Sequence, residues 1–172
     1  SIITAREEIP EDVTLLIVSS PTVDYSPEEI AKIEAFLQRG GDMVVSMTPN
    51  VVEPLDNLNL FFEEWGVRYT DQLIFDSQQS LSSYPMYVVP NIATYEGITD
   101  NLNTKNQFAM IPGALSIEQT GTQTASVTVT PLMISSSTSY AKNIENLSLT
   151  YDREEGDVDG PFNMMVLSER VE

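Results

Sequence analysis

The pattern of apolar and polar positions predicts a strand–helix–strand unit near the start of the chain. Residues 13–18 form an apolar run rich in β-branched side chains, which is typical of a strand buried on both faces. Ser26 and Glu29 have the spacing of a capping box, so a helix is predicted to begin between them. Gly40 fits the end of that helix, and residues 42–47 form a second apolar strand. A unit of this length predicts two parallel strands joined by a right-handed crossover.

The remaining pattern predicts one further helix and then mostly strands. Apolar residues at helical spacing predict a helix over residues 55–65, ended by Gly66. Later apolar runs predict short strands within 67–76, 87–89, 107–119, 124–135 and 162–169. Residues 135–146 are predicted as a loop or a short helix, and residues 152–160 as an acidic turn. We therefore expect a single α/β domain over residues 1–172, in which the last third adds strands to the same sheet.

Charge and composition exclude several classes of function. The chain has 26 acidic and 8 basic side chains, a net charge of −18, which repels nucleic-acid phosphates and anionic lipid headgroups and favours solubility. It contains no cysteine and no histidine, which excludes thiol nucleophiles, histidine-based triads and zinc sites of the Cys/His type. We predict no cofactor, no metal and no enzymatic activity.

Neither a membrane span nor a signal peptide is evident in the sequence. No apolar run approaches the roughly 20 residues that a membrane span needs. The chain starts at Ser1 and ends at Glu172, just after an apolar run. From this we expect a fragment of a longer protein, with any membrane segment outside this sequence.

The loop after the first predicted strand is the candidate binding site. Ligands of strand–helix–strand units lie at the carboxyl ends of the strands. Polar side chains are found there after both strands, and the candidate ligand-binding set is Ser19, Ser20, Thr22, Asp24, Thr48 and Asn50. The loop lacks the glycine spacing of a phosphate cradle. Turn formation and helix capping are the alternative roles for these residue types.

Two other motif matches are incomplete. Ser139 and Lys142 match S-x-x-K, the acylating serine motif, but neither companion motif follows. The acidic turn matches part of a calcium loop with Glu155, Asp157 and Asp159 as ligands, but Val166 stands where the closing glutamate belongs. A chance match is the better interpretation of both.

Several segments in order resemble one family. They are IPEDVTLLIVSSP, YSPEEIAKIEAFLQRGGDMVVSM, NLNLFFEEWGV, YEGITDNL, PLMISSSTSYA and DGPFNMMVLSE. Together these segments resemble the extracytoplasmic auxiliary component of an uncharacterised ABC-type transport system, a family that includes the gliding-motility component GldG. One departure concerns the His-Pro that often precedes the I-T pair in the family, since Glu96 and Gly97 precede Ile98 and Thr99 here.

The resemblance implies a fold, a location and partners. The implied fold is flavodoxin-like or class-I-glutamine-amidotransferase-like, a three-layer sandwich with a mostly parallel sheet. The implied location is the extracytoplasmic face of the cell membrane, with anchoring by transmembrane helices outside this sequence. The implied partners are the ABC permease and ATPase subunits, in a non-enzymatic interaction or substrate-recognition role. The alternative is a catalytically dead amidotransferase-like domain that binds a small polar ligand or sugar at the strand ends.

Overall fold

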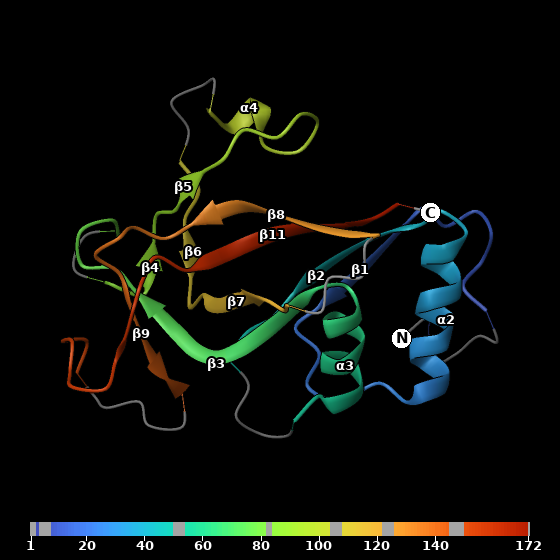
Figure 1. The fold of residues 1–172 in the computed structure, drawn as a ribbon, viewed down its shortest axis with the longest axis horizontal. Helices are drawn as coiled ribbons and strands as arrows, with labels where there is room; N and C mark the ends of the chain where they lie inside the picture. Colours follow the sequence, from blue (N-terminus) through green and yellow to red (C-terminus); the bar gives the residue numbers. More distant parts are fainter. Residues whose placement is uncertain are drawn as a thin grey trace. The chain divides into compact units, whose positions relative to one another are not determined.

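The chain forms two compact units, Ser1–Phe62 and Glu63–Glu172, called here the N-terminal and C-terminal units. The computed structural model describes residues 3, 8–49, 54–81, 84–103, 108–121, 126–144 and 150–171 (Figure 1). The single domain expected over residues 1–172 stays a prediction.

The N-terminal unit is built on the predicted strand–helix–strand segment. Strand β1 (Leu15–Ser19), helix α2 (Pro27–Gln38) and strand β2 (Asp42–Ser46) follow in order, and β1 pairs with β2 in parallel. Helix α3 (Asp56–Glu64) comes next and reaches the boundary between the units. Both predicted helices and the parallel crossover are therefore confirmed.

The ends of helix α2 show why this segment could be predicted. The Glu29 backbone N–H donates to the Ser26 hydroxyl at 3.3 Å, and the Ser26 N–H donates to the Glu29 carboxylate at 3.0 Å. This capping box satisfies two of the N–H groups that a helix start leaves unpaired. Gly40 has a φ of +88°, the left-handed conformation that glycine adopts without steric cost.

Strand β1 is not buried on both faces, contrary to the prediction. Leu16 and Val18 are buried, whereas Leu15 is 47% and Ile17 is 68% exposed. Val44 in β2 is 53% exposed as well. The strand has apolar side chains on both faces, but only one face is covered.

The C-terminal unit is dominated by a seven-stranded sheet in the order β10-β9-β3-β7-β11-β8-β5. Every neighbouring pair in it is antiparallel. Its strands are β3 (Val67–Phe75), β5 (Asn91–Ile92), β7 (Leu115–Gln119), β8 (Val127–Ile134), β9 (Tyr140–Asn143), β10 (Val158–Asp159) and β11 (Asn163–Arg170). Strands β4 (Tyr87–Val88) and β6 (Ile111–Pro112) form a small separate sheet, and α4 (Asp100–Asn103) is a single turn of helix.

The predicted fold class is wrong. The structure is mostly antiparallel, and its main sheet is strongly curved along β3 (Figure 1). β1 and β2 are the only parallel pair among the described strands, and the strands of the last third join the sheet that contains β3 rather than the β1–β2 pair. The physical reason lies in the connections. Parallel neighbours need a crossover of a dozen or more residues, usually a helix, whereas the described helix after β3 is only the four-residue α4.

One smaller prediction is wrong. Residues 140–143 form strand β9, where a loop or short helix was predicted for 135–146. The core of the C-terminal unit includes Ile74, Val88, Ala114, Met133 and Met164.

No helix in the described ranges has the length and apolar character needed to cross a membrane.

Candidate functional site

The predicted strand-end site is partly assembled. The Ser46 hydroxyl lies 3.4 Å from the Ser19 hydroxyl, because the two residues are register partners at the carboxyl ends of β2 and β1. Ser20 has a φ of +44° and donates its N–H to the Ser46 carbonyl at 2.7 Å. Thr22 and Thr48 are exposed, and Asn50 lies outside the described residues. The ligand-binding role of this set stays a prediction.

Asp24, the one acid of that set, has a structural role. Its carboxylate accepts N–H groups from Tyr25 at 2.9 Å, Asn57 at 2.8 Å and Leu58 at 3.2 Å. Two of these donors belong to the first turn of α3, where N–H groups have no partner within the helix and a negative charge is stabilising. Asp24 therefore fixes the start of α3 to the loop that follows β1, whereas the capping role was predicted for the helix that directly follows this loop.

Two segments that carried the family resemblance meet in the C-terminal unit. Ser135 and Phe162 share two hydrogen bonds. The Ser135 N–H donates to the Phe162 carbonyl, and the Phe162 N–H donates to the Ser135 side-chain hydroxyl. Nearby, the Gly160 N–H donates to the Ser139 carbonyl at 2.9 Å. A Cβ at position 160 would overlap the Ser139 hydroxyl, so the chain approaches too closely for any other residue. We call these four residues the serine clasp.

Asp76 ties the serine-rich segment to the turn after β3. It is completely buried, and its carboxylate accepts N–H groups from Gln78 at 3.0 Å, Gln79 at 2.9 Å and Ser136 at 3.2 Å. A buried carboxylate is tolerated when several hydrogen bonds satisfy it. Asp76 was not among the predicted site residues, although an aspartate just after an apolar strand is a turn signal.

The S-x-x-K match has no catalytic geometry. The Ser139 hydroxyl donates to the Ser136 carbonyl at 2.7 Å, whereas Lys142 bonds Glu154 and Asp157. Residue 139 lies just before β9 and residue 142 within it, and residues three apart on an extended chain point to opposite faces. Ser139 therefore has no base from Lys142, in agreement with the interpretation as a chance match.

Lys142 is a buried cation with two carboxylate partners. Its Nζ lies 2.9 Å from Glu154 and 2.9 Å from Asp157, and the side chain is 3% exposed. Burial alone would lower the pKa of Lys142, but the hydrogen bonds and charges of both carboxylates outweigh it and raise the pKa. Burial likewise opposes the charge on Asp157, yet the Glu154 N–H and Lys142 together lower its pKa. The acidic turn is therefore bound to β9.

The calcium-loop match is not supported by this arrangement. Asp157 bonds Lys142, and Asp159 forms an ion pair with Arg153, so two of the three proposed ligands have cationic partners. Within the described ranges, no group of three or more acidic side chains is placed to hold a metal ion.

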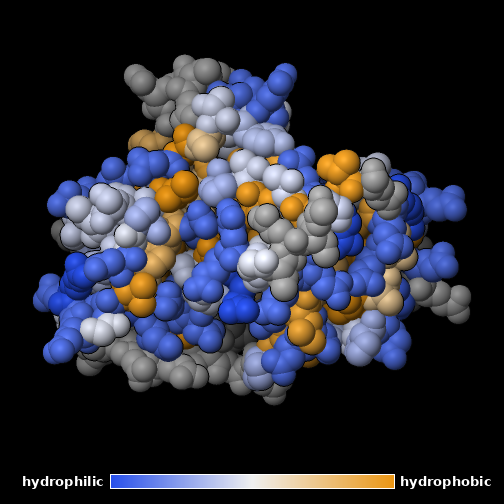
Figure 2. All heavy atoms as spheres, in the orientation of Figure 1, coloured by the Kyte–Doolittle hydropathy of each residue, from blue (hydrophilic) through white to orange (hydrophobic). Residues whose placement is uncertain are grey.

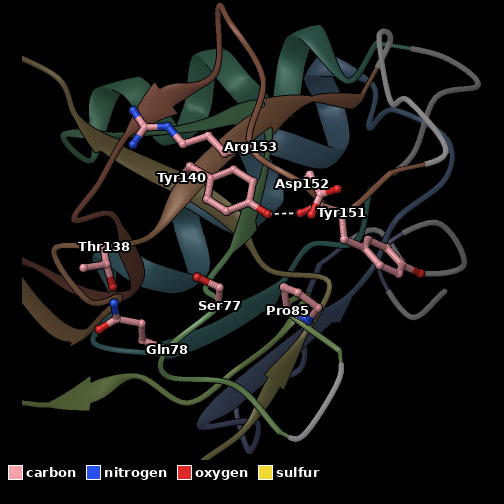
Figure 3. A pocket seen from close by; sticks show the side chains of 8 residues that line it. All are labelled: Ser77, Gln78, Pro85, Thr138, Tyr140, Tyr151, Asp152 and Arg153. Carbon is pink, nitrogen blue, oxygen red and sulfur yellow. Dashed lines mark hydrogen bonds between the residues drawn. The ribbon is translucent and has the colours of Figure 1, made fainter.

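A polar hollow of about 560 Å³ lies beside this turn (Figure 3). It is lined by Ser77, Gln78, Pro85, Thr138, Tyr140, Tyr151, Asp152 and Arg153. The Tyr140 hydroxyl donates to the Tyr151 carbonyl, and the Tyr140 ring stacks on Phe75 with 5.5 Å between the ring centroids. The hollow belongs to the C-terminal unit and not to the strand ends where a ligand was predicted.

The N-terminal unit presents a different feature, an exposed apolar sheet face. Leu15 and Ile17 alternate with buried positions of β1, Val44 lies between two half-buried positions of β2, and Asp42 stands opposite Leu15 in the register. We call these four residues the β1–β2 face. In Figure 2, hydrophilic side chains are interspersed with several hydrophobic patches. An apolar face left open on a parallel strand pair is unusual, because parallel sheets are usually covered on both sides.

Comparisons with known proteins place the chain. A family model described as "ABC-type uncharacterized transport system" matches residues 2–170. Among solved structures, the "mmIFT52 N-terminal domain" is similar in fold, with a TM-score of 0.57 and 15% sequence identity. The match covers 75% of this chain and 62% of that one, so this chain spans less than two thirds of its length. No curated protein matches the chain.

Proposed function

Because the chain belongs to the ABC-type uncharacterized transport system family as an auxiliary domain, we propose that it works by binding other components of the transporter. The components are the permease and ATPase subunits. The role is interaction or substrate recognition rather than catalysis.

The observation that carries this proposal is the β1–β2 face. Ile17 is 68%, Val44 53% and Leu15 47% exposed, and all three lie on one side of two adjacent strands. Clustered exposed apolar side chains on a strongly charged protein mark interaction sites. Burying them against a partner would contribute roughly 25 cal/mol for each Å² removed from water.

A non-enzymatic role agrees with how the polar residues are used. Asp76, Ser135 and Ser139 are buried and are engaged in hydrogen bonds within the fold. Asp24 caps α3, and Lys142 bonds two carboxylates. These side chains therefore support packing rather than form a nucleophile with its base.

The location follows from the same proposal. We place the domain on the extracytoplasmic face of the membrane, held there by segments outside this sequence. The resemblance to extracytoplasmic auxiliary components supports this location. Protease treatment of intact cells tests it, because an extracytoplasmic domain is cut before the membrane is broken and a cytoplasmic one is not.

Co-isolation tests the proposed function. The tagged protein is isolated from solubilised native membranes, and the permease and ATPase are measured by mass spectrometry. We expect both subunits with the wild-type chain and a loss of at least ten-fold with Ile17→Lys, which puts a charge into the β1–β2 face. Leu60→Lys is the matched control, because Leu60 is also an exposed apolar residue, 61% accessible, but lies on α3. Recovery of the tagged chain without either subunit would contradict the proposal.

A second candidate function is the binding of a small polar ligand or sugar. The hollow of about 560 Å³ in the C-terminal unit favours it, because that volume lies in the usual range of ligand sites. Its lining combines hydroxyl, amide and carboxylate groups with Tyr140 and Tyr151. Saturation-transfer NMR with a panel of small sugars tests this candidate, with Gln78→Ala as the variant that should lose the signal.

A further inference from the structure

The uncovered side of the parallel strand pair is a face of the kind that helices cover. Parallel strands are normally covered by helices on both faces, and a right-handed crossover places its own helix on one of them. Here Leu16 and Val18 are buried, while the side chains between them are exposed. The free face is therefore the second of the two that helices cover in α/β proteins.

The size of the face agrees with this occupant. β1 and β2 pair over five register positions, from Leu15 opposite Asp42 to Ser19 opposite Ser46. At about 3.3 Å per residue, the paired strands extend roughly 13 Å. A helix rises about 1.5 Å per residue, so two to three turns cover that length. An added strand would instead pair along an edge of the sheet and would leave this face open.

The β1–β2 face also carries a carboxylate. Asp42 is exposed and stands beside Leu15 across the strands, and its backbone N–H donates to Thr14. Within the described part of the chain, no hydrogen bond or ion pair reaches its carboxylate. A cation on the partner would meet this charge at the border of the apolar contact, where it gives orientation and specificity.

The surrounding charge selects against two other occupants. Residues 1–62 contain 11 acidic and 3 basic side chains, and two of those basic residues, Lys32 and Arg39, donate to backbone carbonyls of their own unit. A second copy would bring its own net charge of −18 to the contact. An anionic membrane surface is repelled in the same way.

We propose that the β1–β2 face docks an amphipathic helix of a transporter subunit, with a lysine or arginine next to its apolar stripe. The apolar stripe covers Ile17, Val44 and Leu15, and the basic side chain pairs with Asp42. This inference rests on the proposed function and adds the chemistry of the partner segment.

Site-specific photo-crosslinking tests the proposal in the assembled complex. Ile17→p-benzoyl-phenylalanine places the probe in the β1–β2 face, and the same substitution at Leu60 is the control on an exposed part of α3. After irradiation of intact cells, the cross-linked peptide is identified by mass spectrometry. We expect a permease peptide with apolar residues at helical spacing and an adjacent lysine or arginine, since the permease is the subunit that reaches the extracytoplasmic side.

Charge variants sharpen the same experiment. Asp42→Asn removes the charge and keeps the shape, and we expect the cross-link yield at position 17 to fall about two- to five-fold, the range of an exposed ion pair. Asp12→Asn is the matched control, an exposed acid of the same unit outside the face, and should leave the yield unchanged. Raising the salt concentration should reduce the yield for the wild-type chain and should have less effect on Asp42→Asn.

Each other outcome overturns the inference. A cross-link to a second copy of this chain would make the face a homodimer contact. If the cross-linked peptide had no basic residue, or if the cross-link yield at position 17 were no greater than at Leu60, the proposed helix-docking site would be wrong.

The proposed function can be judged separately. If the permease and ATPase co-isolate with the chain but Ile17→Lys changes nothing, the β1–β2 face is not the binding surface and the inference fails, whereas the binding of transporter components stands. If neither subunit co-isolates with the wild-type chain, the proposed function itself fails.

Discussion

The two units differ in where their polar and apolar side chains lie: the C-terminal unit buries polar residues, and the N-terminal unit exposes apolar ones. In the C-terminal unit, the buried polar residues Asp76, Ser135 and Ser139 are hydrogen-bonded within the fold. In the N-terminal unit, apolar side chains of the paired strands β1 and β2 lie exposed. The segments that carry the family resemblance thus include residues that hold the fold together by hydrogen bonds and residues that form an exposed apolar face. Substitutions in the two groups should therefore affect different measurements.

The largest expected loss of stability comes from Asp76→Ala. Three backbone N–H groups would lose a charged acceptor inside the protein, and we expect unfolding free energy to fall by about 3–4 kcal/mol. Chemical denaturation followed by circular dichroism measures it. Asp71→Ala, at an exposed position of β3, should change stability by less than about 0.5 kcal/mol. Equal effects at the two positions would contradict the role of Asp76.

Gly160→Ala should have the next largest effect. The added methyl group overlaps the Ser139 hydroxyl in the serine clasp, and forced repacking costs about 1–3 kcal/mol. Gly121→Ala is the control, because nothing lies within 4 Å of a Cβ there. Thermal unfolding measures the stability of both variants against the wild-type chain. A Gly160→Ala protein as stable as Gly121→Ala would show that the close approach is not required.

Lys142→Met should lower the free energy of unfolding by about 1–2 kcal/mol. This is less than the loss for a fully buried ion pair, because Glu154 is 48% exposed. The pKa of Asp157 is lowered, so its contribution is present above the unfolded value near 4 and is lost as pH falls through the folded value. The pKa of Lys142 is raised, so its contribution is present below about 10.4 and is lost as pH rises further. Denaturation across the pH range should show the largest difference between wild type and variant between these limits.

A difference that does not change with pH would contradict the ion-pair account. Burial raises the pKa of Tyr140 and Lys142 lowers it, so stability should fall above about pH 10 in both proteins, and further in the variant, which lacks Lys142. The two proteins are therefore best compared below about pH 10, where the Tyr140 hydroxyl is neutral in both.

Local signals predicted the helices but not the sheet. The capping box at Ser26 and the glycines at 40 and 66 are short-range, because each acts within a few residues of the chain. Strand partners are not local. β9 pairs with β3, and residues 73 and 142 are register partners although they lie far apart in sequence. The resemblance supplied the family, whereas the parallel sandwich that it implied was wrong for this chain.

The candidate site was harder to predict for a related reason. Polar residues at strand ends were visible in the sequence, but the use of Asp24 as a cap depends on where α3 begins. The β1–β2 face was hidden because its strands are apolar on both sides. An alternating strand would have revealed its exposed side, whereas a continuous apolar run does not tell which side is covered.

The smallest expected effect on stability is at the exposed side of the β1–β2 pair, and comparing it with the buried side tests the difference between the two sides directly. Val18 and Val44 lie on neighbouring strands and are 3% and 53% exposed, so one substitution, valine to threonine, can be made on each face. Val18→Thr buries a hydroxyl and should cost about 1–2 kcal/mol. Val44→Thr should cost less than about 0.5 kcal/mol, since water already reaches that side chain. Co-isolation of the permease and ATPase should show the reverse order, with the larger loss for Val44→Thr. If both variants lost stability equally, the face would be covered within the chain itself and could not serve a partner.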